Sequence, residues 1–262
     1  KGYGWARQEE ENSVDEITLD WGLRTLFATD QGDLLGRGFI EKLKYHDRRI
    51  SGLARYRQKQ SLPVKCETYD RRVRQLQGFL KTEINRVLNR LVERYMPARL
   101  IVERIHFRGP ELSRRMNRLV TNCGRRIVEE KLEALQEEYG IEVIEVPAAY
   151  SSQECARCGY VDRKNRSGEE FECRWCQHRA HADVNAARVL KSRRSWLHSK
   201  DGSGWLTKAE LLGRLVARHR NRFPKILRSE EAGEAVPPPA ERAGQQGAAR
   251  TGCQGTSADP RR

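Results

Sequence analysis

Four cysteines form the pattern that most restricts the fold of this chain: two C-x2-C pairs separated by 14 residues. The pairs are Cys155 with Cys158, and Cys173 with Cys176. Such pairs can place four thiolates tetrahedrally around one Zn2+, and a closed shell of four thiolates leaves no open position for catalysis. The polar run KNRSGEE between them is too polar to bury four unliganded thiols. The spacing therefore predicts a structural metal site that holds zinc, or iron in a rubredoxin-like site with the same ligands.

The other three cysteines, Cys66, Cys123 and Cys253, are isolated from one another. An odd total with two close pairs argues against a secreted disulfide framework and for a metal site in a reducing compartment. No segment approaches the ~20 consecutive apolar residues of a membrane span, and the first residues do not resemble a secretory signal. We therefore expect a cytoplasmic protein, associated with the nucleoid and without a membrane partner.

The positive charge is concentrated in one third of the chain. The net charge is +14, and residues 41–126 hold 23 of the 50 Lys and Arg residues but only 8 acidic ones. Such a block favours a polyanion, either nucleic acid or an anionic membrane surface, because each neutralised phosphate releases counterions. The alternative is a helical face that only keeps the protein in solution. The candidates for phosphate contacts are Arg114, Arg115, Arg118, Arg125 and Arg126.

The apolar pattern predicts a mixture of strands and helices. The expected strands are Ile17–Trp21, Leu23–Thr29, Leu34–Phe39, Leu100–Glu103 and Ile141–Val146, the first three in an antiparallel meander. The expected helices run from about Glu41 to Leu62, from Tyr69 to Tyr95 and from Cys123 to Tyr139. The short helical stretch Leu206–Arg222 is expected to dock weakly or not at all, and the residues from Ala235 onward are expected to be disordered.

Three carboxylates stand at the ends of predicted elements. Asp20 ends the first strand, Glu103 ends a later strand, and Asp183 opens the helix after the second cysteine pair. If they converge on one edge of a sheet, divalent cations can neutralise them and align a water with a phosphodiester. Taken singly, the simpler explanations are favoured: a turn residue, a strand-end charge and a helix N-cap.

The order of these motifs resembles the nuclease half of the TnpB/OrfB transposon-encoded proteins, whose descendants are the type V CRISPR effectors. The resemblance covers about residues 16–194. It is carried by Asp20-x-Gly, a basic helical insertion, the strand that ends at Glu103, Tyr150-Ser151-Ser152-Gln153 before the first cysteine pair, and Ala182-Asp183-x-Asn185-Ala186-Ala187 after the second.

The resemblance implies a RuvC-type, RNase H-like fold: an α/β mixed sheet with an inserted helical hairpin and an inserted zinc ribbon. In that fold Asp20, Glu103 and Asp183 match the three metal-binding acids. The implied activity is a metal-dependent, RNA-guided DNA endonuclease of a transposon, with catalytic Mg2+, structural Zn2+, and a guide RNA and a DNA target as partners. A guide-dependent binding protein that does not cut and an inactive transposon remnant stay open as alternatives.

The expected organisation has four parts: a RuvC-like core in residues 1–149 with a basic helical insertion at about 41–96, a zinc ribbon in 150–181, a last core helix in 182–200, and a weakly ordered helix with a disordered tail in 201–262.

The sequence also departs from the family. Trp21, Arg104 and Ala182 stand where an aliphatic residue, a second acid and an arginine are usual. Residue 1 is lysine, and only about 15 residues precede the first strand, where family members carry an N-terminal recognition module. We therefore expect a fragment of a longer protein.

Overall fold

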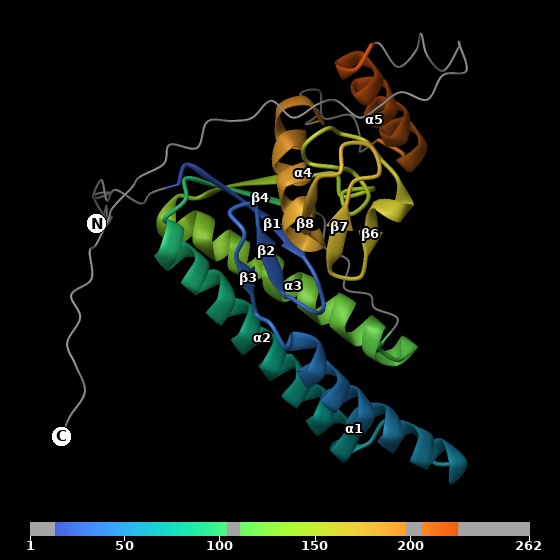
Figure 1. Ribbon diagram of the computed structural model, residues 1–262. Coiled ribbons are helices and arrows are strands. Elements are labelled where there is room, and N and C mark those ends of the chain that lie inside the picture. Colours follow the sequence, from blue (N-terminus) through green and yellow to red (C-terminus); the bar gives the residue numbers. More distant parts are fainter. Residues whose placement is uncertain (1–13, 104–110, 198–205, 225–262) are drawn as a thin grey trace, which may run out of the picture.

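A five-stranded mixed sheet forms the centre of the protein (Figure 1). The computed structural model describes residues 14–103, 111–197 and 206–224. The strands are β1 (Glu16–Trp21), β2 (Phe27–Thr29), β3 (Leu34–Leu35), β4 (Arg99–Glu103) and β5 (Glu142–Val146). Their order is β3-β2-β1-β4-β5, with β1, β2 and β3 antiparallel and β4 parallel to both β1 and β5. The expected mixed α/β sheet is therefore present.

Helices cover both faces of this sheet, which explains why the middle residues of its central strands β1 and β4 are all buried. On one face, the strand residues Ile17, Leu19 and Leu100 share a core with α1 (Phe39–Lys59), α2 (Glu67–Tyr95) and α3 (Arg114–Tyr139). On the other face, Ile101 and Val146 pack against Leu190 of α4 (Ala182–Leu197).

Two of the predicted strands are shorter than expected because glycines interrupt them. The strand expected at Leu34–Phe39 ends at Leu35, since Gly36 and Gly38 have positive φ values of 69° and 79°. A Cβ atom on Gly36 would lie 2.7 Å from the Cβ atom of Leu26, so no larger residue fits there. The strand expected at Leu23–Thr29 begins only at Phe27, after a turn at Gly22.

The helix α3 begins nine residues before the expected Cys123, because Ser113 caps it. The Ser113 hydroxyl accepts a hydrogen bond from the Met116 amide at 3.1 Å, and the Ser113 amide donates to Asp47 of α1 at 2.7 Å. These contacts join the start of α3 to α1. A polar cap residue is a weak signal in a sequence when the preceding residues do not form a recognisable turn.

A second, three-stranded antiparallel sheet follows the core. It contains β6 (Arg166–Ser167), β7 (Glu170–Glu172) and β8 (Arg179–His181), in that order, and a 3-10 turn at Arg163–Asn165 precedes it. The helix α4 begins at Ala182, directly after β8. Because no linker separates the two elements, the small sheet and α4 are held in a fixed relation.

The expectation that Leu206–Arg222 docks weakly or not at all is wrong. This stretch forms α5 (Lys208–Arg222), with a capping box between Thr207 and Glu210. Leu211 and Leu215 are buried against the segment that carries the first cysteine pair, including Tyr150 and Val161. Amphipathicity gives a helix an apolar face but does not say what covers that face. The expected disorder from Ala235 onward lies outside the described residues.

None of the helices in the described part of the chain combines the length and the apolar character that a membrane crossing needs.

Candidate functional site: a carboxylate cluster beside a four-cysteine centre

The structure brings Asp20, Glu103 and Asp183 together at one end of the main sheet. β1 and β4 run parallel with Leu19 opposite Val102, so the next residues, Asp20 and Glu103, lie side by side at the same end of the sheet. The Trp21 amide donates a hydrogen bond to Glu103 Oε1 at 3.3 Å. Asp183 comes from the first turn of α4. Asp20 and Asp183 are buried.

Burial and mutual repulsion raise the pKa values of the two strand carboxyls. The pKa of Asp20 is raised well above its ordinary value, first by burial and then by the charges of Glu103 and Asp183. The pKa of Glu103 is raised to about 7, mainly by burial. The carboxyl groups of Asp20 and Glu103 are also hydrogen-bonded to each other. Three acids in such a site are costly as bare charges, and a divalent cation relieves this cost.

The donor set fits Mg2+. Mg2+ prefers carboxylate oxygens, keeps several waters, and is bound in proteins through a few carboxylates. The cluster supplies three carboxylates from three different elements, and burial and mutual repulsion raise the pKa values of Asp20 and Glu103, an effect that a bound cation would offset. Asp20, Glu103 and Asp183 would hold the ion.

The glycine of the Asp20-x-Gly motif has a steric reason. A Cβ atom on Gly22 would lie 2.6 Å from the Thr25 carbonyl oxygen, so the turn after β1 excludes any side chain there. The same Cβ position lies 3.9 Å from Asp183 Oδ2. Gly22 therefore lets the chain turn closely beside the carboxylate cluster.

The sequence interpretation missed Arg166, a cation at this site. Arg166 is the first residue of β6, and its Nη2 atom lies 2.8 Å from Asp183 Oδ1. Its Nε atom donates to the Gly168 carbonyl at 3.0 Å, which fixes the guanidinium. In the sequence, Arg166 lies inside the polar run KNRSGEE, where nothing distinguishes it from its neighbours.

The N-cap interpretation of Asp183 is wrong. The helix α4 starts at Ala182, and the Asp183 amide donates to His181 Nδ1 at 3.3 Å. The Asp183 carboxylate, freed from a capping role, faces Arg166 and the other two acids.

The four paired cysteines form one cluster. The sulfur atoms of Cys155, Cys158, Cys173 and Cys176 all lie within 4.8 Å of one another. The Sγ atoms of Cys155 and Cys176 are 3.6 Å apart, as are those of Cys158 and Cys173. Zn–S bonds of about 2.3 Å give a tetrahedron with edges of about 3.8 Å, so the donors fit a structural Zn2+.

Local hydrogen bonds prepare this cluster for a metal. The Tyr160 and Cys176 amides point at the sulfur atoms of Cys158 and Cys173, at 3.4 and 3.5 Å. Hydrogen bonds from the Cys155 and Cys158 thiols lower the pKa of Cys173 to about 2. Metal ligation needs the thiolate form, which these contacts favour at Cys173.

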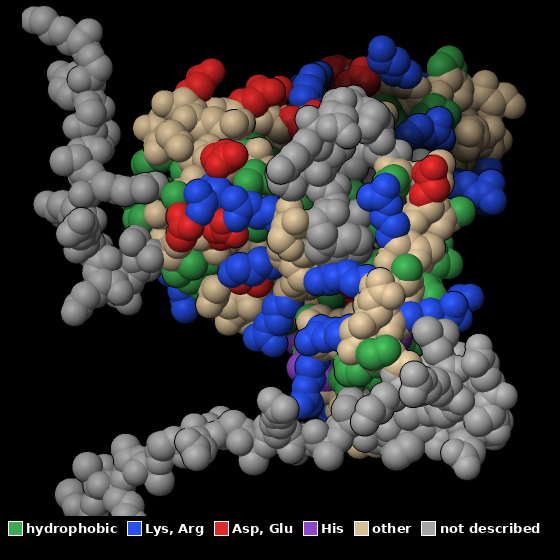
Figure 2. Space-filling model, turned by 90° about the horizontal axis from the view of Figure 1, so that it is seen from above, with side chains coloured by type: hydrophobic (Ala, Val, Ile, Leu, Met, Phe, Trp, Pro, Cys, Tyr) green, Lys and Arg blue, Asp and Glu red, His purple; other side chains and the backbone are tan. Residues whose placement is uncertain are grey.

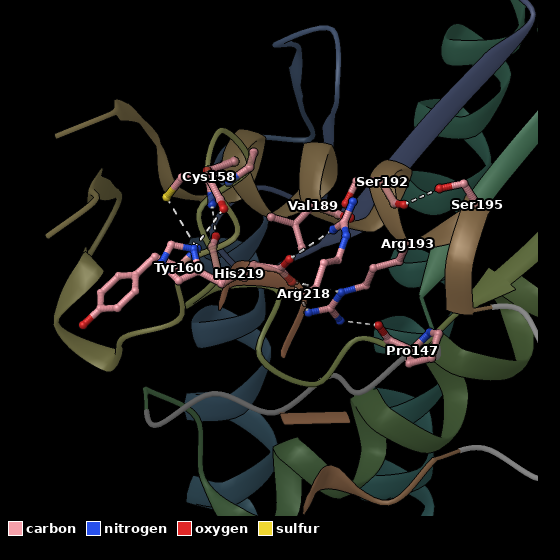
Figure 3. A network of polar contacts seen from close by, with 12 residues as sticks. Pro147, Cys158, Tyr160, Val189, Ser192, Arg193, Ser195, Arg218 and His219 are labelled. Carbon is pink, nitrogen blue, oxygen red and sulfur yellow. Dashed lines mark hydrogen bonds and ion pairs between the residues drawn. The ribbon is translucent and has the colours of Figure 1, made fainter. Parts of the chain in front are cut away.

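Two polar links join the cysteine segment to α4, and Figure 3 shows one of them. Asn185 donates to the Glu154 carbonyl at 2.8 Å and accepts from the Ala156 amide at 3.0 Å. Arg193, which is completely buried, forms an ion pair with Glu154 at 2.7 Å and donates to the Pro147 carbonyl at 2.5 Å. These contacts attach the cysteine segment to α4, the helix that also carries Asp183.

The arginines expected to contact phosphates all lie in the first half of α3, but their environments differ. Arg125 and Arg126 form ion pairs with Glu129 and Glu130, at 2.7 and 3.4 Å. Arg115 stands 5.9 Å from the Tyr69 ring, and Arg114 and Arg118 are exposed. Figure 2 shows that Lys and Arg side chains also gather over the middle of the face seen from above.

Comparison with known proteins finds similarity around the cysteine segment. The family model described as "Cas12f1-like, TNB domain" matches residues 126–190. The endodeoxyribonuclease Cas12f1 of Sulfoacidibacillus thermotolerans is 44% identical over 64 residues, which are 24% of this chain and 15% of that protein. InsQ of Escherichia coli strain K12, provisionally assigned as an RNA-guided DNA endonuclease, is 46% identical over 52 residues, 20% of this chain and 13% of its own.

Among solved structures, a Cas12f1 complex with single-guide RNA and target DNA aligns with a TM-score of 0.49 and 18% identity. That alignment covers 68% of this chain and 49% of the other. The chain therefore spans only part of the length of the relatives it matches.

Proposed function

Since the chain is a relative of the TnpB-like proteins and type V CRISPR effectors, with a Cas12f1-like TNB domain matched in residues 126–190, we propose that it is a metal-dependent, RNA-guided DNA endonuclease. The observation that carries this proposal is the convergence of three carboxylates from β1, β4 and α4. Such a cluster is costly without cations and useful with them.

In this proposal, Asp20, Glu103 and Asp183 would hold Mg2+, which would supply the positive charge that neutralises the phosphate and stabilises the attacking and leaving oxygens. Asp20 and Glu103 would bind the metal from β1 and β4 of the main sheet, and Asp183 would bind it from α4. Arg166 lies at the edge of the cluster, 2.8 Å from Asp183 Oδ1, where its guanidinium can meet a phosphate oxygen. The cysteine centre positions Arg166, because Arg166 belongs to β6 of the small sheet, and the strands of this sheet lie between the two cysteine pairs and directly after the second.

We assign the main sheet to the RNase H-like class. An antiparallel meander, β1 to β3, is followed by the parallel strands β4 and β5, with one acid at the end of β1 and one at the end of β4. This is the element order on which the resemblance to RuvC-type nucleases rests.

Guide RNA and target DNA are the proposed partners. Two observations support them: the excess of Lys and Arg in residues 41–126, and the sequence similarity to Cas12f1 and to InsQ, which is provisionally assigned as an RNA-guided DNA endonuclease. The protein in this proposal recognises the backbone and shape of the nucleic acid, while base pairing selects the sequence.

The non-cutting alternative gains no specific support. All three acids are present and adjacent. The unusual Trp21 packs edge-on against Phe27, with ring centroids 4.1 Å apart, and its side chain belongs to the core. Ala182 is buried and also packs inside. Arg104 lies outside the described residues.

The test uses the purified chain with its guide RNA, a DNA target and Mg2+. Asp183→Ala is expected to abolish cleavage while nucleic-acid binding changes less than threefold, because the substitution removes a metal ligand and no phosphate contact. Asp162→Ala, which removes a carboxylate whose contact is local to the 3-10 turn, is the matched control and should cleave normally. Cleavage by the Asp183→Ala variant would disprove the proposed site.

A further inference from the structure

One face of α1 combines exposed cations and aromatic rings along the outside of the molecule. This outer α1 face consists of Tyr45, Arg48, Gly52, Arg55, Tyr56 and Lys59. Their spacing of three and four residues places them on one side of the helix, opposite the buried Leu43 and Ile50. α1 runs beside α2 and projects away from the sheet (Figure 1).

The cations of this face have no acidic partner among the described residues. After the buried Asp47, α1 contains no acidic residue. Arg48 and Arg55 donate only to the carbonyls one turn before them, at 3.4 and 3.3 Å. In contrast, Arg125 and Arg126 of α3 are each paired with a glutamate. The positive charge available to a partner therefore lies on α1 rather than at this part of α3.

Gly52 lies at the centre of the outer α1 face, and no contact within the protein requires glycine at this position. A Cβ atom added there would meet no atom within 4 Å, so packing does not require glycine. Glycine is unfavourable in a helix interior, second only to proline. Its lack of a side chain helps only a partner whose backbone comes close to the helix at this point.

The two tyrosines extend the face at either end of Gly52. Tyr56 is 62% exposed, and Tyr45 accepts a hydrogen bond from Arg49 at 2.7 Å. The Arg49 guanidinium also lies 5.3 Å from the Tyr45 ring. The tyrosines are 11 residues apart, about 16 Å along the helix. Aromatic rings among unpaired cations suit a sugar-phosphate backbone, where rings stack and cations meet phosphates.

We propose that the outer α1 face binds the phosphate backbone of a nucleic-acid strand, which passes Gly52 in close contact. This surface rests on the proposed function and names where its nucleic acid is held. An anionic membrane fits less well, since a helix that lies in a membrane needs a wide apolar face, and that of α1 is buried in the core. RNA and DNA share the chemistry that the face recognises.

The first experiment compares two charge-matched double variants of the full chain. The probes are a DNA duplex, an RNA duplex and an RNA-DNA hybrid of one sequence, titrated at several salt concentrations. Arg48→Gln with Arg55→Gln should weaken binding at least tenfold in low salt and reduce the salt slope by about 0.9 per lost contact on duplex DNA. The control, Arg86→Gln with Arg179→Gln, removes two exposed arginines that are each paired with a glutamate, and it should change affinity less than twofold. The probe whose affinity falls most identifies the kind of nucleic acid that this face binds.

The second experiment tests the close approach at Gly52. Gly52→Ala and Gly52→Leu both improve helix propensity and meet open space, so neither should lower Tm. Gly52→Leu should weaken binding at least fivefold, because its side chain holds the backbone away, and Gly52→Ala should weaken it less. Equal affinity of the wild type and Gly52→Leu would disprove the close contact.

The outcomes separate this surface from the nuclease proposal. The proposed surface would be disproved if the two double variants lost affinity equally. It would also be disproved if the chain bound phosphatidylserine vesicles through Arg48 and Arg55 without binding nucleic acid. If the α1 variants kept Mg2+-dependent cleavage and the nucleic-acid affinity of the wild type, the outer α1 face would be disproved as a binding surface, and the nuclease proposal would stand. Binding that depends on α1, without cleavage by the wild type, would overturn the nuclease proposal alone. No nucleic-acid binding by the wild type would overturn both.

Discussion

At the scale of single residues, two of the buried aspartates, Asp20 and Asp30, have opposite surroundings. Asp20 has the carboxylates Glu103 and Asp183 as neighbours. Asp30 accepts a hydrogen bond from the Thr18 amide at 2.8 Å and forms an ion pair with Lys191 at 2.6 Å. The neighbours of Asp20 destabilise a negative charge on its carboxyl group, whereas the neighbours of Asp30 stabilise one.

Asp20→Asn should therefore raise the Tm of the metal-free protein, because it removes a buried charge that the neighbours repel. It should also abolish the rise of Tm that Mg2+ produces, since binding to the folded state alone is what stabilises it. Asp30→Asn, the matched control, should lower stability by about 1 to 3 kcal/mol and keep the Mg2+ effect. Thermal melting in EDTA and in Mg2+ measures both. A Tm increase with Mg2+ in Asp20→Asn would contradict the assignment of the metal ligands.

At the scale of elements, α5 depends on the cysteine centre for its place. His219 Nδ1 lies 3.1 Å from the Cys158 carbonyl oxygen. The rings of Tyr160, Trp175 and Phe223 surround His219, with centroids 5.1 to 5.6 Å from it. The small sheet has few buried apolar residues, so metal binding supplies a large part of its folding energy.

Cys173→Ser, or removal of the metal with a chelator, should therefore release α5 together with residues 150–180. Hydrogen exchange should show lost amide protection in both segments, while β1 and β4 keep theirs. Cys123→Ser is the control, because Cys123 lies on α3 and takes part only in a 3.5 Å contact with Gln77. Unchanged protection of α5 after metal removal would mean that its docking does not depend on the ribbon. Purified protein without bound zinc or iron would contradict the metal site itself.

At the scale of the whole molecule, the buried pair Arg193–Glu154 joins the cysteine segment to the main sheet. Arg193 comes from α4, which packs on β1, β2, β4 and β5, and Glu154 precedes the first cysteine. The charge of Arg193 also lowers the pKa of Glu103, against the larger effect of burial. One buried cation thus acts on both centres.

Arg193→Met should destabilise the protein by about 3 to 5 kcal/mol, since the buried Glu154 then keeps only its 4.0 Å ion pair with Arg218 among the described residues. The double variant Arg193→Met with Glu154→Gln should recover much of this loss, because no uncompensated charge remains. Arg179→Met is the matched control: its ion pair with Glu172 is exposed, and the loss should be at most about 1 kcal/mol. Denaturant unfolding of the wild type, Arg193→Met, Glu154→Gln and the double variant measures the coupling. A double variant as unstable as the single one would show that packing, rather than charge, dominates.

The sequence alone determined the features that depend on residue type and spacing. Four cysteines in two close pairs specify a tetrahedral donor set wherever they lie, and apolar periodicity specifies strands and helices. The parallel pairing of β1 with β4 was not needed to select Asp20 and Glu103 as candidates, because both close apolar strands. Their role as metal ligands stays a prediction.

Only the tertiary structure decided which charges are paired and which surfaces are covered. Arg166 of β6 reaches Asp183 of α4, and Asn185 of α4 is hydrogen-bonded to Glu154 and Ala156 beside the first cysteine, because the fold brings together residues that are far apart in the chain. α5 docks because the segment that carries the first cysteine pair offers it an apolar surface. Arg125 and Arg126 are neutralised by their glutamates, whereas the cations of the outer α1 face are not. A sequence fixes the number of charges in a segment, but electrostatic energy depends on the distances between them, which the fold sets.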